Sequence, residues 1–224
     1  MVCHCCFFFA LFSLFRYVIS IGFIERPLVV GLFWGVLTGD YTLSLYIAIF
    51  FELFWLDLIP VGTFIPPHLT AATFSALSLA TFLGYETPSQ MVFIFFASMP
   101  MAWFGAKMEG VIRDRERVNY NRLLNWARNP ESDAIPTQIV ARSAGRTFVV
   151  AWGLFYVSTL VLYFTFQFVA GLYPTLFTTI KISWPHLWIA ASIGGLMALR
   201  LKQANIVLTT GITIIAVFVI SGCF

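Results

Sequence analysis

Four ionisable residues lie in a stretch near the N-terminus that is otherwise apolar enough to enter a bilayer. They are Asp40, Glu52, Asp57 and His68. Ionisable side chains at membrane depth are costly to bury, so each one is a candidate for a functional role. Their types, three acids and one imidazole, suit hydrogen bonding to a polar solute rather than lipid contact.

A pair of prolines, Pro66 and Pro67, directly precedes His68. Both lack a backbone N–H and cannot continue a helix. Irregular backbone at membrane depth is tolerated where protein buries it or where it lines a wet cavity. We therefore expect residues 60–70 to be irregular and inside the protein. Together with the Gly-interrupted segment 28–39, this break indicates a transporter-type solute site.

Glu52 is the strongest candidate for solute binding, because a carboxylate accepts two hydrogen bonds from neighbouring sugar hydroxyls. We expect it to face a polar cavity formed with the Pro66-Pro67-His68 bend. The alternative is a buried structural acid that pairs with an arginine or a neighbouring subunit.

The other candidates each have a structural alternative. Asp40 follows a glycine and either contacts the solute or caps the helix that begins at Tyr41. Asp57 lies five residues after Glu52, which rotates it by about 140° around a helix, so it is either part of the site or solvated at the interface. His68 either donates to a sugar hydroxyl or is a satisfied buried residue or cap.

The composition indicates a polytopic membrane protein. The 224 residues are 60% hydrophobic and 10% charged, with a mean hydropathy of +0.88. Soluble domains carry about 25% charged residues. The length allows about six to eight crossings or half-crossings at roughly 20 residues each. We predict an all-α fold that includes broken or re-entrant segments, and the net charge of +3 does not suggest nucleic acid as a partner.

Apolar segments divide the chain into three regions. Residues 1–106 form an N-terminal membrane region, residues 107–146 a basic connection, and residues 147–224 a C-terminal membrane region. The expected apolar segments cover about 3–23, 28–37, 41–58, 69–83, 90–106, 148–169, 187–199 and 206–220.

The connection 107–146 carries eight Lys and Arg against five Asp and Glu. This excess of positive charge predicts that it is cytoplasmic. Alternating charges in 113–117 indicate a solvated helix, and 129–133 reads as a turn. Its arginines either dock an acidic soluble partner or serve only to orient the chain in the membrane.

Residues 26–84 resemble the membrane-embedded IIC subunit of the mannose–sorbose family of the bacterial sugar phosphotransferase system. The matching residues are Arg26-Pro27-Leu28, Gly31, Gly35, Gly39-Asp40, Glu52-Leu53, Gly62 and Pro66-Pro67. Where the family commonly has an acid after the prolines, this chain has His68.

The resemblance implies a multi-pass sugar permease of the bacterial cytoplasmic (inner) membrane that works as part of an oligomer. It implies that the chain binds and translocates a hexose-type sugar beside a membrane subunit, IID. Cytoplasmic subunits IIA and IIB would supply the phosphoryl group, so no cofactor, metal or catalytic residue is expected in this chain.

Two other functions remain open. A scaffold subunit that only stabilises a partner would share the small-residue helix faces. An intramembrane enzyme would need paired catalytic residues, and no Ser/His or H-E-x-x-H arrangement is present. The cluster Cys3, His4, Cys5 and Cys6 has no second Cys/His pair at metal-binding spacing.

Overall fold

The computed structural model describes residues 2–19, 23–56, 67–128, 134–172, 182–198, 206, 209–210 and 213. Within these residues the chain is an all-α membrane protein, as predicted, with helices α1–α6 and α8 and no strand. Most of the apolar segment expected over 206–220 falls outside this description, as do residues 57–66.

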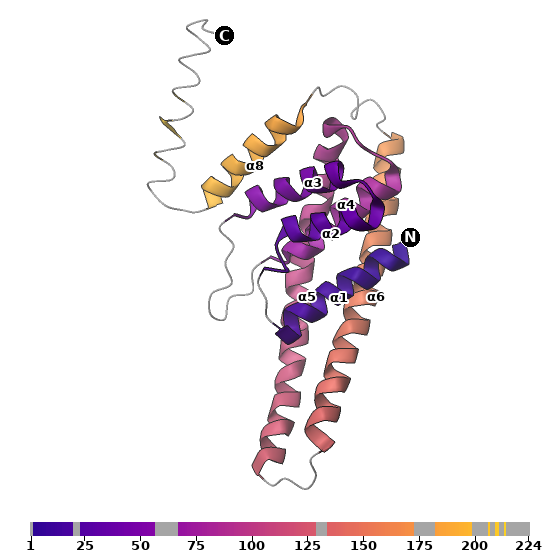
Figure 1. The fold of residues 1–224 in the computed structure, drawn as a ribbon, viewed down its shortest axis with the longest axis vertical. Helices are drawn as coiled ribbons and strands as arrows, with labels where there is room; N and C mark the ends of the chain where they lie inside the picture. Colours follow the sequence, from indigo (N-terminus) through magenta and orange to yellow (C-terminus); the bar gives the residue numbers. More distant parts are fainter. Residues whose placement is uncertain are drawn as a thin grey trace, which may run out of the picture.

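Two long helices, α5 (Pro88–Arg128) and α6 (Ala134–Leu172), run side by side for most of the length of the molecule (Figure 1). They contain 41 and 39 residues. At 1.5 Å per residue each is about 60 Å long, roughly twice the thickness of a bilayer core. Pro88–Val118 and Val140–Leu172 are long and apolar enough to cross a membrane. Each helix is therefore longer than a bilayer core, and part of it projects past its apolar span.

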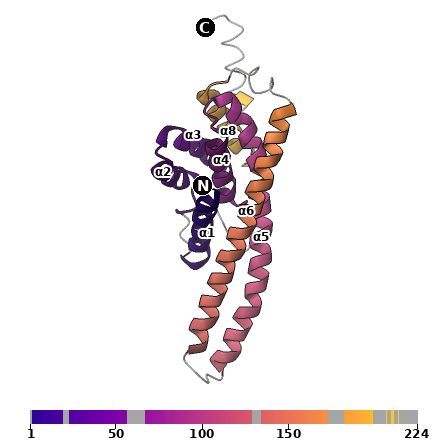
Figure 2. The same cartoon turned by 90° about the vertical axis from the view of Figure 1, so that its right-hand side faces the viewer.

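The projecting part is the polar block of the sequence. The described part of the basic connection expected over 107–146 is helical, including the helix predicted at 113–117: α5 continues to Arg128 and α6 begins at Ala134. The turn predicted over 129–133 lies outside the described residues. Ion pairs one turn apart, from Glu109 to Arg113 and from Asp114 to Arg117, stabilise the helical form of the charged sequence. We call residues 107–128 and 134–146 the charged hairpin; in Figure 2 its lower part stands clear of the shorter helices.

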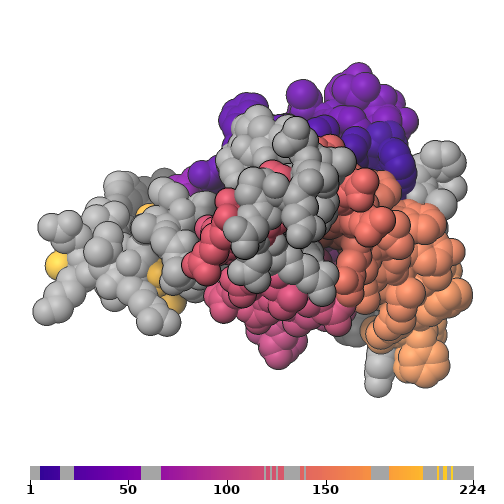
Figure 3. Space-filling view, turned by 90° about the horizontal axis from the view of Figure 1, so that it is seen from below, coloured from indigo at the N-terminus to yellow at the C-terminus, as the bar shows by residue number. Residues whose placement is uncertain are grey.

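The shorter helices gather on one side of the long pair. They are α1 (Val2–Ile19), α2 (Pro27–Thr38), α3 (Tyr41–Phe54), α4 (Leu69–Leu83) and α8 (Trp184–Ala198). Viewed from the hairpin end, the indigo and purple N-terminal helices lie along one flank of α5 and α6 (Figure 3). α1 packs on α6, α2 on α3, α4 on α5, and α8 on α3.

Helix α4 is the centre of this packing, because every residue from Leu69 to Ala80 is buried. Its bounds match the predicted segment 69–83. It ends at Gly84, whose positive φ of 65° suits glycine and lets its N–H bond the Ala80 carbonyl. The buried hydroxyls of Thr73, Ser75 and Ser78 donate to backbone carbonyls of the helix itself; Ser78, for example, donates to the Phe74 carbonyl at 2.6 Å.

Close backbone approaches hold α2 and α8 against α3. A Cβ on Gly31 would lie 2.4 Å from the Cβ of Ala48, and a Cβ on Gly195 would lie 2.5 Å from the Leu53 carbonyl oxygen. Both glycines are buried, and neither position has room for a side chain. Helix α3 also ends earlier than the predicted residue 58, at Phe54 with Trp55 as its C-cap.

Candidate functional site

The chain is broken next to the conspicuous prolines. Pro67 and His68 are not helical, and α4 begins at Leu69. The predicted irregular backbone is thus present at these two residues, while Pro66 and Asp57 lie outside the described part of the chain. The backbone N–H of His68 donates to the Ala102 carbonyl of α5 at 2.9 Å. The bond gives a partner to a backbone N–H at the start of α4, where N–H groups have no acceptor within the helix.

The imidazole of His68 is the N-cap of α4. Its Nδ1 accepts a hydrogen bond from the Ala71 backbone N–H at 3.2 Å, and the residue is only 3% exposed. The capping alternative considered from the sequence is therefore confirmed. Because Nδ1 is an acceptor here, the other ring nitrogen carries the proton of the neutral imidazole.

His68 also lines a small, partly open pocket between α1, α4, α5 and α6, which we call the His68 pocket. Its polar side chains are those of Ser13, His68, Glu109 and Ser158. The remaining wall is apolar and partly aromatic, with Phe9 stacked on Phe155 at a ring-centroid distance of 3.9 Å. A mostly apolar pocket with a few convergent polar groups is the usual form of a small-molecule site.

Glu109 was not among the candidates from the sequence, although it lies in this pocket and is only 1% exposed. The sequence places it three residues into the polar block, which suggested a solvated position. The helical register is the signal that could have found it. Gly105, Met108, Glu109 and Ile112 are spaced i, i+3, i+4 and i+7, and all four line the pocket.

Asp40 lies in a different place. Its carboxylate accepts from the Leu43 backbone N–H at 3.1 Å and caps α3, as its structural alternative predicted. It also lines a second pocket, the Asp40 pocket, which includes Thr81 and Glu86 near the end of α4. Buried Trp34 donates to the Thr81 hydroxyl at 3.1 Å beside it.

Glu52 lines neither of these pockets. One carboxylate oxygen lies 3.4 Å from the Arg26 guanidinium, and the other accepts from the Leu28 backbone N–H at 3.3 Å. Leu28 is in the first turn of α2, where backbone donors lack helical partners and an anion is favoured. The contacts of Glu52 are those of its structural alternative, an acid paired with an arginine.

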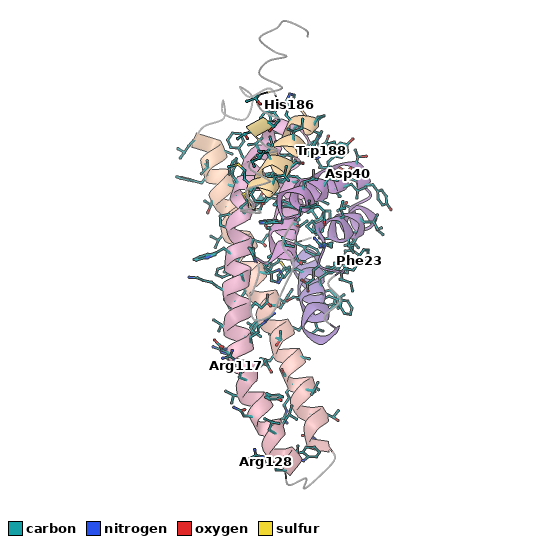
Figure 4. The ribbon with its side chains drawn as sticks, turned by 90° about the vertical axis from the view of Figure 1, so that its left-hand side faces the viewer. Phe23, Asp40, Arg117, Arg128, His186 and Trp188 are labelled. Carbon is teal, nitrogen blue, oxygen red and sulfur yellow. The ribbon has the colours of Figure 1, made fainter. Side chains whose placement is uncertain are left out.

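The described candidates therefore occupy three separate places: Glu52 in the last turn of α3 against the start of α2, Asp40 at the start of α3, and His68 at the start of α4. Figure 4 places Asp40 toward one end of the molecule and Arg117 and Arg128 toward the other. Among the described residues no group of three His, Cys, Asp or Glu gathers to hold a metal ion.

The geometry defines an all-α membrane protein whose capped, interrupted helices surround pockets with a few polar side chains. The family model described as the sorbose-specific IIC component of the phosphotransferase system matches residues 2–197. The chain belongs to this family of membrane-embedded sugar-transport components. No curated protein and no solved structure matches the chain.

Proposed function

We propose that this chain is the subunit that binds and translocates a hexose-type sugar in a phosphoenolpyruvate-dependent phosphotransferase system. The observation that carries the proposal is the family match, which covers nearly all the described helices, from α1 to the end of α8. The interrupted backbone at Pro67-His68 and the His68 pocket beside it support a solute path through the interior.

Phosphoryl transfer then belongs to partner subunits. A cytoplasmic IIB subunit, itself phosphorylated by IIA, modifies the sugar as this chain delivers it. The charged hairpin is the part of the described chain that extends well beyond a bilayer, and its exposed Arg115, Arg128, Arg142 and Arg146 offer a basic surface to such a partner.

A membrane partner of the IID type fits the outer face of α6. Large apolar side chains are exposed along this helix over its apolar half, at Val157, Val161, Phe164 and Phe168. Their i, i+4, i+7 and i+11 spacing places them on one stripe that lipid or another membrane subunit would cover. We therefore infer a complex in which this chain is one of at least two membrane subunits.

The roles of the candidate residues follow their positions. His68 shapes the pocket at the start of α4, and Asp40 shapes the second pocket near the other end of the same helix. Glu52 positions α2 against α3 through Arg26 and Leu28. We assign no role to Asp57 and Pro66.

The function is tested by uptake. The chain is expressed with IIA, IIB and IID subunits of a sorbose-type system in bacteria that lack their own mannose- and sorbose-class permeases. Radiolabelled D-mannose, D-glucose, D-fructose and L-sorbose are offered separately. We expect at least one sugar to accumulate as its phosphate only when this chain is present. Equal accumulation with and without the chain for all four sugars would refute the proposal.

A further inference from the structure

We propose that Trp103 and Lys107 of α5 form a binding site for the phosphate of an anionic lipid headgroup, at the membrane surface from which the charged hairpin projects. The two residues are one helical turn apart, and the Lys107 Nζ lies 4.0 Å from the centroid of the Trp103 ring. Both side chains are exposed. Such a site would fix the depth of α5 in the bilayer, independently of the transport function proposed above.

Lys107 lies where the bilayer core ends. Residues 88–106 of α5 contain no charged side chain, and Lys107 is the first charged residue of the helix. From Pro88 to Lys107 is 19 residues, or about 29 Å at 1.5 Å per residue, which matches the thickness of about 30 Å of a bilayer core. When the apolar part of α5 spans the core, the Lys107 ammonium is therefore level with the headgroups.

Helix α6 marks the same membrane surface. Ser143 donates to the Glu116 carboxylate, and the two helices run antiparallel. Trp152 is nine residues after Ser143 and Lys107 is nine residues before Glu116, so both lie at about the same height. The ring centroids of Trp152 and Tyr156 are 6.5 Å apart, and Tyr156 is exposed. Tryptophan and tyrosine are enriched at membrane–water interfaces, so the aromatic residues of both helices indicate one surface at this height.

The two side chains of the site point away from the packed helices. Phe96, Trp103 and Lys107 are spaced i, i+7 and i+11 and form one exposed stripe of α5. Ala102 and Glu109, which are buried, lie on the other side of the helix. The stripe thus places a phenyl ring in the core, an indole at its edge and an ammonium beside the headgroups, an order that follows the polarity of a bilayer.

The pair has donors to offer to a phosphate. Among the described residues, none accepts a hydrogen bond from the Trp103 indole N–H, and none forms an ion pair with Lys107. The three donors of the ammonium are therefore open to oxygen atoms outside the chain. The acid on the same stripe, Asp114, is two turns further on and lies 3.5 Å from the Arg117 guanidinium, so it does not compete for Lys107.

A net anionic lipid fits this site better than a zwitterionic one. In phosphatidylcholine the choline cation neutralises the phosphate of its own headgroup, whereas phosphatidylglycerol leaves the phosphate charge for a cation of the protein. Charge-assisted hydrogen bonds from lysine to phosphate are stronger than neutral ones, and the face of the indole holds the ammonium in place. Phosphatidylglycerol is therefore the ligand to test.

Native mass spectrometry of the purified full-length chain in a neutral detergent measures the Kd of each added lipid. We expect the wild type to bind dioleoyl-phosphatidylglycerol more tightly than dioleoyl-phosphatidylcholine. Lys107→Gln removes the charge from an exposed position and should raise the Kd for phosphatidylglycerol by about fivefold, the usual effect of one basic residue at an anionic surface. Lys107→Arg keeps the charge and should retain the wild-type Kd within about twofold.

The matched control is Arg128→Gln, which removes the same charge from the same helix. Arg128 is 21 residues beyond Lys107, about 30 Å along the helix axis and several Debye lengths away, so its loss should leave the Kd unchanged. Trp103→Leu keeps an apolar side chain but removes the ring beneath the ammonium, and it should also raise the Kd. This variant decides the question if Lys107→Gln does not fold, which the thermal unfolding midpoint reports.

Equal Kd values for the two lipids in the wild type would exclude an anionic-lipid site and assign the stripe to lipid tails or to a membrane subunit. Wild-type affinity for phosphatidylglycerol in folded Lys107→Gln, or in folded Trp103→Leu, would remove the headgroup from this pair. An equal rise in Kd in Lys107→Gln and Arg128→Gln would show attraction by net charge alone. Each of these results would overturn the site and leave the transport function as proposed.

Discussion

The Arg26 guanidinium lies 3.4 Å from the Glu52 carboxylate, which ties the residue before α2 to the last turn of α3. The second oxygen of Glu52 accepts from the Leu28 N–H. One acid thus neutralises an arginine and caps an open helix end that enters the packed part of the chain. This arrangement indicates that Glu52 positions two helices. The first prediction therefore concerns the stability of the protein and not its affinity for sugar.

Glu52→Gln is expected to lower stability without removing transport. The glutamine oxygen can still accept from Leu28, whereas the ion pair with Arg26 is lost. Because the Arg26 side chain is 34% exposed, solvent screens this pair and its loss should cost only about 0.5–1 kcal/mol. The thermal unfolding midpoint in detergent measures this cost, and sugar uptake per molecule of membrane protein should remain within about twofold, which is less than 0.5 kcal/mol.

The double variant with Arg26→Gln is the control. If the two residues act as a pair, the double variant should lose less stability than the sum of the losses in Glu52→Gln and Arg26→Gln. A tenfold fall in uptake at normal protein level in Glu52→Gln would instead place Glu52 in the sugar site, as the sequence first suggested.

Asp40 gives the second prediction, which distinguishes a cap from a charge needed for transport. Asn caps helices about as well as Asp, whereas Ala cannot accept the Leu43 N–H. Asp40→Asn should therefore keep wild-type stability and uptake, and Asp40→Ala should lose about 1 kcal/mol of stability. Unfolding midpoints and uptake of both variants check this. Loss of uptake in folded Asp40→Asn would show that the charge itself is required in the Asp40 pocket.

Local signals explain why much of the fold was predictable. The Gly-Asp pair at 39–40 ends one helix and caps the next, and the structure shows both, with a φ of 81° at Gly39. The prolines marked the break before α4, and Gly84 marked its end. In each case the determining residues lie within a few positions of the element they define, so a single sequence carries the information.

Tertiary placement explains what the sequence left undetermined. Whether Glu52 meets a sugar or Arg26 depends on how α2 packs on α3, across 26 positions of chain. Glu109 was hidden because net charge marks the whole block 107–146 as solvated, whereas burial follows one face of a continuous helix. The composition of the block mixes the residues of the buried face with the exposed ones. Only their spacing along the helix distinguishes the two groups.

Gly31 gives the third prediction, which concerns the packing of α2 on α3. A Cβ there would meet the Ala48 Cβ at 2.4 Å and the Ser44 carbonyl oxygen at 2.9 Å, and the backbone oxygen cannot rotate away. Gly31→Ala should therefore destabilise the protein by about 1–3 kcal/mol, as overpacked cores do. The unfolding midpoint in detergent measures the loss.

Gly153 on α6 is the matched control, because nothing lies within 4 Å of a Cβ built there. Gly153→Ala should be neutral or slightly stabilising, since alanine favours the helix by about 1 kcal/mol. Replacing Ala48 by Gly in the Gly31→Ala background should restore part of the loss. A Gly31→Ala variant as stable as wild type would contradict the close approach of these helices.

The orientation of the charged hairpin gives the last prediction. Basic residues that flank membrane spans are retained on the cytoplasmic side. The block carries eight Lys and Arg, and Arg117 and Arg128 lie at the end of the molecule opposite Asp40 (Figure 4). Alkaline phosphatase inserted after Arg128 should therefore be inactive, because that enzyme requires the periplasm to form its disulfides. The same insertion after Glu86, at the other end of α5, should be active. Activity after Arg128 with none after Glu86 would invert the topology and place the charged hairpin on the periplasmic face. Activity at both positions would show that α5 does not cross the membrane.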